Sequence, residues 1–306
     1  MRVTVVGDST LDVAARPAAE PVAGGDVPAR ITLSPGGQGA NVAVRLARAG
    51  VEVRLATAIA DDAAGRLIRS ALEADGVAMA RVTSERSGMV VALLDPSGER
   101  TMLSDRVTLE PMALADACAG AGWVHCSGYA LADDATGDAV AAVLASLPVG
   151  TRISAGGGSL PRDAERAGRV RERLTTASVS LLILGRDEAA ALLDLALPSL
   201  AAAADALAAA FPRLIAVVTG AAAGSSAAGP GFALSVPAPD APTPVVDATG
   251  AGDAFAAALI GALLTAEWPP DVTILRGAME AGSRQGALVS RVLGAQAPVA
   301  GEARAR

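Results

Sequence analysis

The segment D-A-T-G-A-G-D, Asp247 to Asp253, places two carboxylates around a glycine turn, directly before a long apolar run. If a helix begins near Gly250, the backbone N–H groups of Gly250, Ala251 and Gly252 have no intrahelical acceptors and form an anion site. Asp253 would then stand in the first turn, where its carboxylate could take a proton from a hydroxyl group that attacks phosphorus. The simpler alternative is that the glycines make a tight turn and that Asp253 only complements the helix dipole.

The earlier segment P-G-G-Q-G-A-N-V-A, Pro35 to Ala43, also joins a glycine turn to a predicted helix. Close approach of another backbone or a ligand explains its three glycines. Asn41, in the first turn, offers donors and an acceptor to a polar ligand. The segment is not a Walker loop, because no G-K-[ST] follows. Taken alone, it is also consistent with a plain helix cap.

A third polar segment, G-D-S-T-L-D at Gly7 to Asp12, follows the N-terminal strand-like run. The Asp12 carboxylate is an acceptor that could hold a vicinal diol of a sugar. A surface-turn carboxylate is the alternative that this segment leaves open.

The elements that must position these segments alternate between strand-like and helix-like runs, which is typical of a parallel sheet with helices on both faces. The predicted strands are Val3–Val6, Val53–Ala56, Trp123–Cys126, Arg152–Ala155, Leu181–Leu184 and Ile215–Val218. The predicted helices are Ala40–Ala49, Ala63–Ala74, Asp134–Ala145, Asp187–Leu193, Ala201–Ala210, Ala251–Thr265 and Val272–Val289. In such α/β folds ligands bind at the carboxyl ends of the strands.

Two regions, residues 11–33 and 77–103, interrupt this alternation with short segments that contain Pro, Gly and Ser. The second includes D-P-S-G-E-R at residues 95–100, which predicts a hairpin turn. We therefore predict a small antiparallel sheet apart from the main one, which could serve as a lid, with an ordinary edge extension as the alternative. Arg100 and Arg106, in or beside this lid, are expected at a solvated strand edge.

The composition excludes several classes of protein. The chain has 306 residues, enough for a substantial core, and no apolar run of the length that spans a bilayer. The N-terminus reads as a strand and not as a secretion signal, so a cytoplasmic protein is expected. A net charge of -7 with 2% aromatic residues disfavours a nucleic-acid surface. Cys118, Cys126 and the single histidine, His125, lack metal-site spacing and are predicted to be buried structural residues.

The three polar segments together resemble the ribokinase-like (PfkB) family of carbohydrate and nucleoside kinases over essentially the whole chain. D-A-T-G-A-G-D-A-F is similar to the C-terminal signature of that family, and G-G-Q-G-A-N-V-A to its N-terminal signature. G-D-S-T-L-D resembles its opening strand and substrate aspartate. The resemblance implies a single domain, residues 1–306, with a ribokinase-like three-layer αβα sandwich, a mostly parallel central sheet and a small β-sheet lid.

The resemblance also implies roles for particular residues. Asp253 would be the catalytic base, and Gly250, Ala251 and Gly252 would form the anion hole for the transferred phosphoryl group. Asp247 would help to bind a monovalent cation such as K⁺. The residues that would hold the sugar are Asp12, Gly37, Gln38 and Asn41.

The nucleotide side matches the family less closely. V-V-T-G-A-A-A-G, Val217 to Gly224, resembles the strand and glycine turn over the ATP phosphates, which implies nucleotide contacts from Thr219, Gly220 and Gly224, with a further one from Ser283. The family usually carries N-x-x-E, whose Asn and Glu organise magnesium-bound water. This chain has G-R-D-E, in which Glu188 is kept and Gly185 replaces the asparagine. I-S-A-G-G-G also lacks the aspartate expected near position 156.

The function implied is an ATP- and Mg²⁺-dependent kinase that phosphorylates a hydroxymethyl group of a ribose- or fructose-like sugar by direct in-line transfer. A nucleoside such as adenosine or pseudouridine is the alternative acceptor. A catalytically impaired sugar-binding protein is an alternative of another class, motivated by Gly185. Gln38 stands where some sugar kinases of the family have lysine, which disfavours an already phosphorylated sugar. Lids of the family often pair between subunits, so a homodimer through the lid is expected, with no nucleic-acid or membrane partner.

Overall fold

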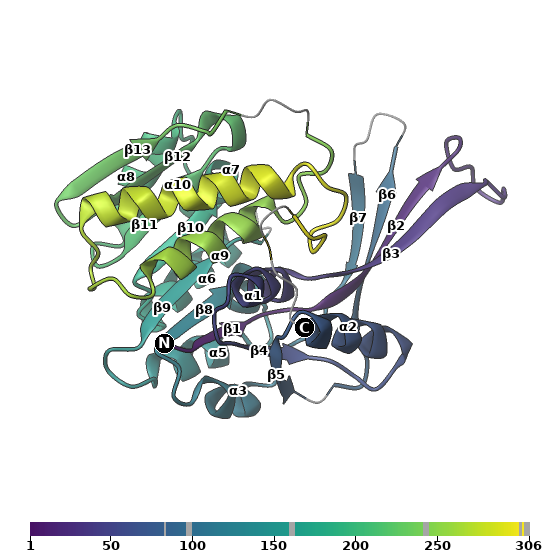
Figure 1. Ribbon diagram of the computed structural model, residues 1–306, viewed down its shortest axis with the longest axis horizontal. Coiled ribbons are helices and arrows are strands. Elements are labelled where there is room, and N and C mark those ends of the chain that lie inside the picture. Colours follow the sequence, from purple (N-terminus) through teal and green to yellow (C-terminus); the bar gives the residue numbers. More distant parts are fainter. Residues whose placement is uncertain (83, 96–99, 159–162, 241–244, 300–301, 303–306) are drawn as a thin grey trace.

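The computed structural model describes residues 1–306 except 83, 96–99, 159–162, 241–244, 300–301 and 303–306. Its large sheet comprises β1 Val3–Val6, β4 Val53–Ala58, β5 Ala78–Val82, β8 Trp123–Ser127, β9 Arg152–Gly156, β10 Leu181–Gly185, β11 Ile215–Thr219, β12 Ser225–Gly229 and β13 Phe232–Val236. Their order is β13-β12-β11-β10-β9-β8-β1-β4-β5 (Figure 1). Neighbouring strands run parallel except where β12 pairs with β11 and β13. The predicted mostly parallel sheet is therefore confirmed.

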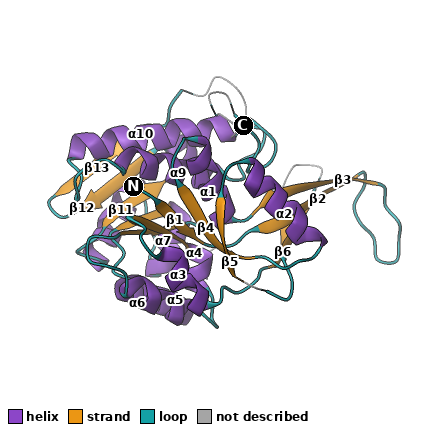
Figure 2. Ribbon diagram, turned by 60° about the horizontal axis from the view of Figure 1, so that its bottom comes forward, coloured by secondary structure: helices purple, strands orange, loops and turns teal. Residues whose placement is uncertain are grey.

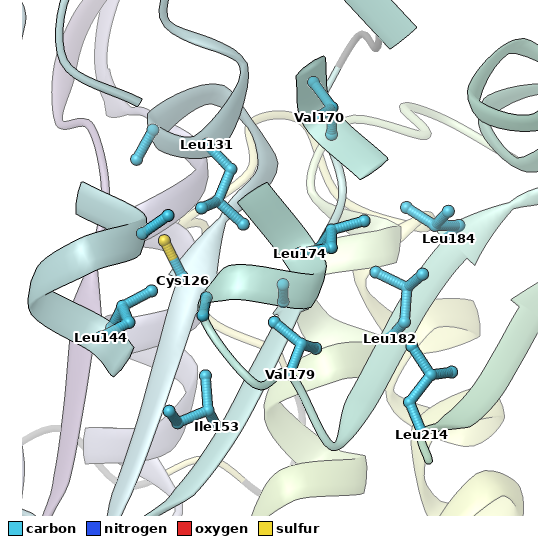
Figure 3. Packing of buried hydrophobic residues seen from close by; sticks show 14 of the residues in the cluster. Cys126, Leu131, Leu144, Ile153, Val170, Leu174, Val179, Leu182, Leu184 and Leu214 are labelled. Carbon is cyan, nitrogen blue, oxygen red and sulfur yellow. The ribbon is translucent and has the colours of Figure 1, made fainter. Parts of the chain in front are cut away.

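Helices cover both faces of this sheet, with the strands between two helical layers in Figure 2. One layer holds α1 Gln38–Arg48, α2 Ala63–Ala74, α9 Ala251–Leu263 and α10 Val272–Val289. The other holds α3 Pro111–Cys118, α4 Gly128–Ala132, α5 Gly137–Ala145, α6 Ala164–Thr176, α7 Arg186–Leu193 and α8 Leu200–Ala210. Each layer packs on its own apolar cluster, and Figure 3 shows part of the second one, where Leu182 and Leu184 of β10 approach Val170 and Leu174 of α6. The three-layer αβα sandwich is confirmed.

A second, four-stranded sheet projects from this body (Figure 1). It comprises β2 Thr10–Pro17, β3 Ala29–Gly36, β6 Gly88–Leu94 and β7 Arg100–Asp105, in the order β3-β2-β6-β7. Only β2 and β6 are parallel; the other pairs are antiparallel. This is the small sheet that the sequence predicts from its two irregular regions, except that the two regions join through a parallel pair where antiparallel strands were expected. Most of the predicted turn at residues 95–100 lies outside the described residues.

The assignment of residues 77–82 to the small sheet is wrong. Ala78–Val82 forms β5, which pairs in parallel with β4 at the edge of the large sheet. Val77 is buried and Met79 packs against the core beneath α2, so this strand completes a strand-helix-strand unit with β4 and α2. A short alternating strand looks the same in sequence whether it joins a lid or the edge of a main sheet.

No helix within the described part of the chain is long and apolar enough to cross a membrane.

Candidate active site

A cavity of about 250 Å³ opens where the carboxyl ends of β9, β10 and β11 meet the first turns of α1 and α9. It is lined by Gln38, Val42, His125, Gly156, Gly157, Gly158, Ile183, Leu184, Gly185, Glu188, Thr219, Gly252, Asp253 and Ala256. This is the edge of a parallel sheet where ligands are expected to bind. The cavity brings together residues from both signature segments and from the predicted nucleotide side.

Asp253 lies in the first turn of α9 and faces this cavity, half-buried. Burial raises the pKa of its carboxyl to about 7; the hydrogen bond from Asn41 opposes this rise, and the negative charges of Asp8 and Glu188 add to it. The Asn41 Nδ2 donates to Oδ2 of Asp253 over 2.7 Å, and the Gln38 side chain is a second, weaker partner. A carboxyl with a pKa near the working pH is suited to accept a proton and release it again.

The glycines before Asp253 serve different purposes. Gly250 is the N-cap of α9 with φ of 77°, and a Cβ there would come within 2.8 Å of the Ala295 Cβ. This backbone conformation and this packing both require glycine. The N–H of Ala251 turns back to the Ala248 carbonyl over 3.2 Å. Gly252, in contrast, faces open space and lines the cavity, so its missing side chain keeps the helix N-terminus accessible to an anion.

The N-terminal signature packs on the chain's own backbone. Gly37, the N-cap of α1, has φ of 93°, and a Cβ there would lie 2.7 Å from the Asp8 carbonyl oxygen. Gln38 lines the cavity, and its Oε1 accepts a hydrogen bond from the Ser127 hydroxyl. Among the four predicted sugar ligands, Gln38 and Asn41 therefore reach the neighbourhood of Asp253, whereas Gly37 shapes the turn that carries them.

Asp12 lies on β2 of the small sheet and does not line this cavity. Burial raises the pKa of its carboxyl, against a 2.7 Å hydrogen bond from the Thr10 hydroxyl and the charge of Arg106. Arg106 forms an ion pair with the buried Asp8 and lies 3.7 Å over the ring of Tyr129. These three residues line a second cavity of about 230 Å³. The expectation of a solvated edge for Arg106 is wrong, because its side chain is only 26% exposed.

Glu188, which the sequence predicts on the nucleotide side, lines the cavity from the first turn of α7. Burial raises the pKa of its carboxyl to about 6, although its Oε2 accepts the Gly185 N–H over 2.7 Å. Gly185 has ordinary extended dihedrals, φ -72° and ψ 157°, and a Cβ there would lie 3.4 Å from that Oε2. The backbone therefore does not demand glycine where the family has asparagine. Within the described residues no three His, Cys, Asp or Glu side chains gather as a metal site.

The other predicted nucleotide contacts divide into two groups. Thr219, at the end of β11, lines the cavity, and its hydroxyl lies 3.4 Å from the Leu184 carbonyl. Gly220 and Gly224 form the tight turn into β12, closed by a 2.9 Å bond from Gly220 N to Gly224 O. Ser283 is half-buried within α10. These last three do not line the cavity.

Asp247, predicted to assist a monovalent cation, is buried. Its Oδ1 accepts the Thr249 N–H over 2.8 Å, and its Oδ2 accepts the Gly294 N–H over 2.9 Å. The carboxylate therefore ties the loop before α9 to the C-terminal segment. A carboxylate has about four lone-pair sites, so a K⁺ ion is compatible with these two bonds.

Two residues at the site were not assigned to it from the sequence. His125, predicted to be structural, has a satisfied ring, with Nδ1 2.9 Å from the Ser154 hydroxyl, yet it also lines the cavity. Burial lowers the pKa of His125 to about 4, so the ring is neutral. Gln296 donates from Nε2 to the Asn41 Oδ1 over 3.0 Å. Nothing in the local sequence marks Gln296, because its partner lies 255 residues away.

The pfkB family of carbohydrate kinases matches residues 1–300 of this chain. The chain belongs to that family. It is 29% identical over 314 residues to a fructokinase from Klebsiella pneumoniae, an alignment that covers 96% of this chain and 94% of that protein. The protein is thus a sugar kinase, a phosphotransferase with an alcohol group as acceptor.

Solved structures agree with the fold. A ribokinase from Thermotoga maritima superposes with a TM-score of 0.77 at 19% identity, covering 97% of this chain and 96% of that one. A fructokinase from Vibrio cholerae, solved with fructose, ADP and potassium ion bound, superposes with a TM-score of 0.74 at 23% identity, covering 96% and 94%. The ribokinase-like fold implied by the sequence motifs is confirmed.

Proposed function

We propose that this sugar kinase transfers the terminal phosphoryl group of ATP to a hydroxymethyl group of a ribose- or fructose-like sugar, with Asp253 as the base. The observation that carries the proposal is the Asp253 carboxyl itself. It faces a cavity at the N-terminus of α9, its pKa lies at about 7, and an amide from α1 fixes its orientation. Proton acceptor and anion-binding backbone then meet at one point, as phosphoryl transfer to an alcohol requires.

In this proposal the ionised Asp253 accepts the proton of the attacking hydroxyl. Gln38 and Asn41, which already bond to that carboxylate, would share their remaining hydrogen-bonding capacity with the sugar hydroxyls. Gly252 leaves the N-terminus of α9 open, so the backbone N–H groups of Gly250 and Gly252 would face the charge that develops on the phosphoryl oxygens, whereas the Ala251 N–H already donates to the Ala248 carbonyl. The small sheet carries Asp12, which would hold the sugar from the lid side.

The cavity chemistry fits a nucleotide with Mg²⁺. Glu188 and Asp253 line one cavity, burial raises the pKa of both carboxyls, and the described lining contains no arginine or lysine. Mg²⁺ typically takes one or two carboxylates, several waters and substrate phosphates, and does not need a full protein cage. When bound, the metal would neutralise the phosphate charge, with Glu188 holding it through water. Thr219 would contact the ATP phosphates, and Asp247 would take part in a K⁺ site.

A panel of acceptors tests the proposal. Ribose, fructose, adenosine and pseudouridine would each be incubated with ATP, Mg²⁺ and the purified chain, with and without K⁺, and the products assigned by ³¹P NMR. Phosphorylation of a sugar hydroxymethyl group is the expected result. Phosphorylation of a nucleoside instead would show that the acceptor is a nucleoside and not a free sugar. Sugar binding by calorimetry with no transfer to any acceptor would favour the impaired sugar-binding protein.

We also propose that two copies of the chain pair through the small sheet. Alternation along the strands and their register place Val13, Ile31, Leu33, Val91 and Leu103 on the face opposite Asp12. Ile31 and Leu33 are 62% and 58% exposed, and such a contiguous apolar face is typical of a protein interface. Light scattering after size exclusion is expected to give a dimer, and Leu33→Asp a monomer. A monomeric parent chain would refute the pairing.

A further inference from the structure

We infer that Gln296 is a positioning residue for the base: it fixes the side-chain amide of Asn41 in the orientation that donates to Asp253. The inference rests on the proposed role of Asp253 and adds a residue that the signature motifs do not contain. Gln296 touches neither Asp253 nor the cavity. Its effect passes through one hydrogen bond to Asn41.

The direction of each bond follows from what the groups can donate. An ionised carboxylate only accepts, so Asn41 must turn its NH₂ group toward Asp253, at 2.7 Å. The Asn41 Oδ1 then points the other way and needs a donor. Gln296 supplies it from Nε2 over 3.0 Å. Without that donor, a half-turn of the Asn41 amide would present its oxygen to the carboxylate, which repels it.

The burial of the Gln296 side chain indicates that its amide group does more than stabilise the fold. Gln296 is 6% exposed, and its Oε1 is buried without a hydrogen-bond partner among the described residues. A buried carbonyl without a partner destabilises a fold, and an apolar side chain of similar size would avoid that penalty. The bond to Asn41 is the one hydrogen bond recorded for this side chain in the described structure.

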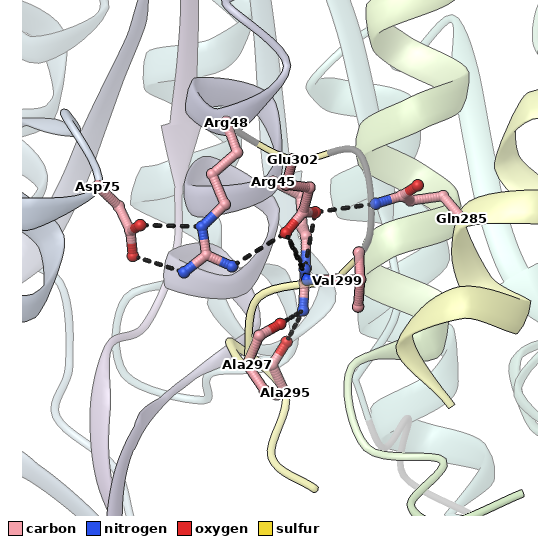
Figure 4. A network of polar contacts seen from close by, with 8 residues as sticks. All are labelled: Arg45, Arg48, Asp75, Gln285, Ala295, Ala297, Val299 and Glu302. Atoms are coloured by element: carbon pink, nitrogen blue, oxygen red, sulfur yellow. Dashed lines mark hydrogen bonds and ion pairs between the residues drawn. The ribbon is translucent and has the colours of Figure 1, made fainter. Parts of the chain in front are cut away.

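A buried ionic network holds the segment that carries Gln296 against α1, the helix that carries Asn41 (Figure 4). Arg45 of α1 donates to the carbonyls of Ala295, at 2.6 Å, and Ala297, at 3.0 Å. Glu302 pairs with Arg45 at 2.7 Å and with Arg48 at 3.2 Å. Both arginine side chains are 2% exposed. The geometry between α1 and the C-terminal segment is therefore fixed on both sides of residue 296.

The same segment also contacts the loop that leads to the base. Gly294 donates its N–H to Asp247 over 2.9 Å, and Ala295 packs where a side chain on Gly250 would clash. Residues 294–297 thus lie against both the helix with the amide and the loop before α9. Gln296 is placed to set the orientation between the two.

Two substitutions at this position separate orientation from charge. In Gln296→Glu the introduced carboxylate, when ionised, can only accept, so the Asn41 NH₂ turns to it and away from Asp253. In Gln296→Met the donor is lost without a new charge. Asp8, Glu188, Gln38 and Asn41 are the groups that act on the Asp253 carboxyl, and only Asn41 changes in the methionine variant.

We expect kcat to fall roughly tenfold to a hundredfold in Gln296→Glu, the size of a lost hydrogen bond to a charged group, with a smaller change in KM. The acid limb of the kcat/KM profile should move to higher pH in both variants, because the Asn41 bond favours the ionised base. A shift with Gln296→Glu alone would mean that the added charge acts directly, and would overturn the inference. The inference would also be overturned if, in both variants, kcat stayed within about twofold and the acid limb within about 0.2 pH unit of the parent enzyme.

Gln285→Met is the matched control. Gln285 of α10 donates to Glu302 over 2.8 Å in the same network (Figure 4). Among the described residues, the Asn41 side chain bonds to Asp253 and Gln296 and not to Gln285. It should lower thermal stability while the acid limb stays in place. If Gln296 were only structural, all variants would behave like this control.

A readout that needs no phosphoryl transfer keeps this test separate from the proposed function. The Asp253 carboxyl would be titrated by NMR in protein labelled with ¹³C-aspartate and assigned with Asp253→Asn. A higher titration midpoint in Gln296→Met than in Gln285→Met supports the positioning role, even in a preparation that phosphorylates no sugar. Equal midpoints overturn it.

Discussion

Asp253→Asn is expected to abolish most activity and, at the same time, to stabilise the protein above neutral pH. Burial raises the pKa of this carboxyl from 3.8 to about 7. The folded state therefore holds a proton between these two pH values that the unfolded chain has released. Stability of the parent protein falls as pH rises through this window, because the unfolded state binds fewer protons. Asparagine has no charge to bury, so its variant lacks this loss.

The magnitude follows from the two pKa values. A folded-state pKa about 3 above the unfolded one corresponds to roughly 4 kcal/mol of lost stability once both states are ionised. About 2–3 kcal/mol of this develops between pH 5 and pH 8. Urea denaturation of both proteins at these two pH values measures it. The advantage of the asparagine variant should be larger at pH 8 by that amount, whereas Asp205→Asn, at an exposed position on α8, should change stability by less than about 0.5 kcal/mol at either pH.

Measurements of turnover and of stability together test the assignment of Asp253 as the base. Loss of a general base typically costs about 10²–10⁴ in kcat. An asparagine variant with normal turnover would refute the catalytic role of Asp253. An equal stability difference at pH 5 and pH 8 would refute the half-buried, high-pKa carboxyl on which the proposed chemistry depends.

Three further predictions concern the rest of the site. Gly185→Asn should have unchanged or slightly higher stability in urea denaturation, because asparagine is at least as good an N-cap as glycine and the backbone admits it. It should also lower the Mg²⁺ concentration that gives the half-maximal rate. A loss of stability of more than about 1 kcal/mol would contradict this prediction. Asp247→Ala should lower the free energy of unfolding by roughly 2–4 kcal/mol in the same assay, because two backbone N–H groups lose their acceptor. It should also remove any activation by K⁺ in rate measurements. A free energy of unfolding within about 0.5 kcal/mol of the parent value would refute the role of these two hydrogen bonds. Asp8→Asn should move the acid limb of the kcat/KM profile to lower pH, because the charge of Asp8 raises the pKa of Asp253. Arg106→Met should move it to higher pH, because Arg106 neutralises Asp8. Shifts of the same sign in the two variants would exclude this coupling.

The parts of the fold that sequence patterns predict are those where apolar runs and turn residues coincide. β1, β8, β10 and β11 are buried apolar strands and were predicted within one or two residues. Helix α6 was not predicted, because its charged sequence A-E-R-A-G-R-V-R-E-R-L-T-T buries only a narrow stripe that includes Ala167, Val170 and Leu174. The strand β12, S-S-A-A-G, has no large apolar side chain at all and forms because β11 and β13 flank it.

The residues of the site also divide into those that a local sequence pattern predicts and those that it does not. Asp253 and Asn41 are recognisable because each follows a glycine turn at a helix start, which is a local pattern. Gln296 and Arg106 act through partners far along the chain, and no local pattern records such a partner. His125 looks structural and is structural, yet its strand ends at the cavity. Residues that shape a site through tertiary contacts become visible only once the chain is folded.

The charge balance of the cavity argues for a neutral acceptor. Its described lining contains the carboxyls of Glu188 and Asp253 and no arginine or lysine. Arg106, which lines the second cavity, already pairs with Asp8. A phosphorylated sugar would bring a dianion toward these acids with no cation free among the lining residues, whereas an unphosphorylated sugar needs only hydrogen bonds. The nucleotide phosphates can tolerate the same surroundings because the helix N-terminus and a bound metal would supply their countercharge. The charges of the described lining thus support the proposed free sugar on the acceptor side and the proposed use of Mg²⁺ on the donor side.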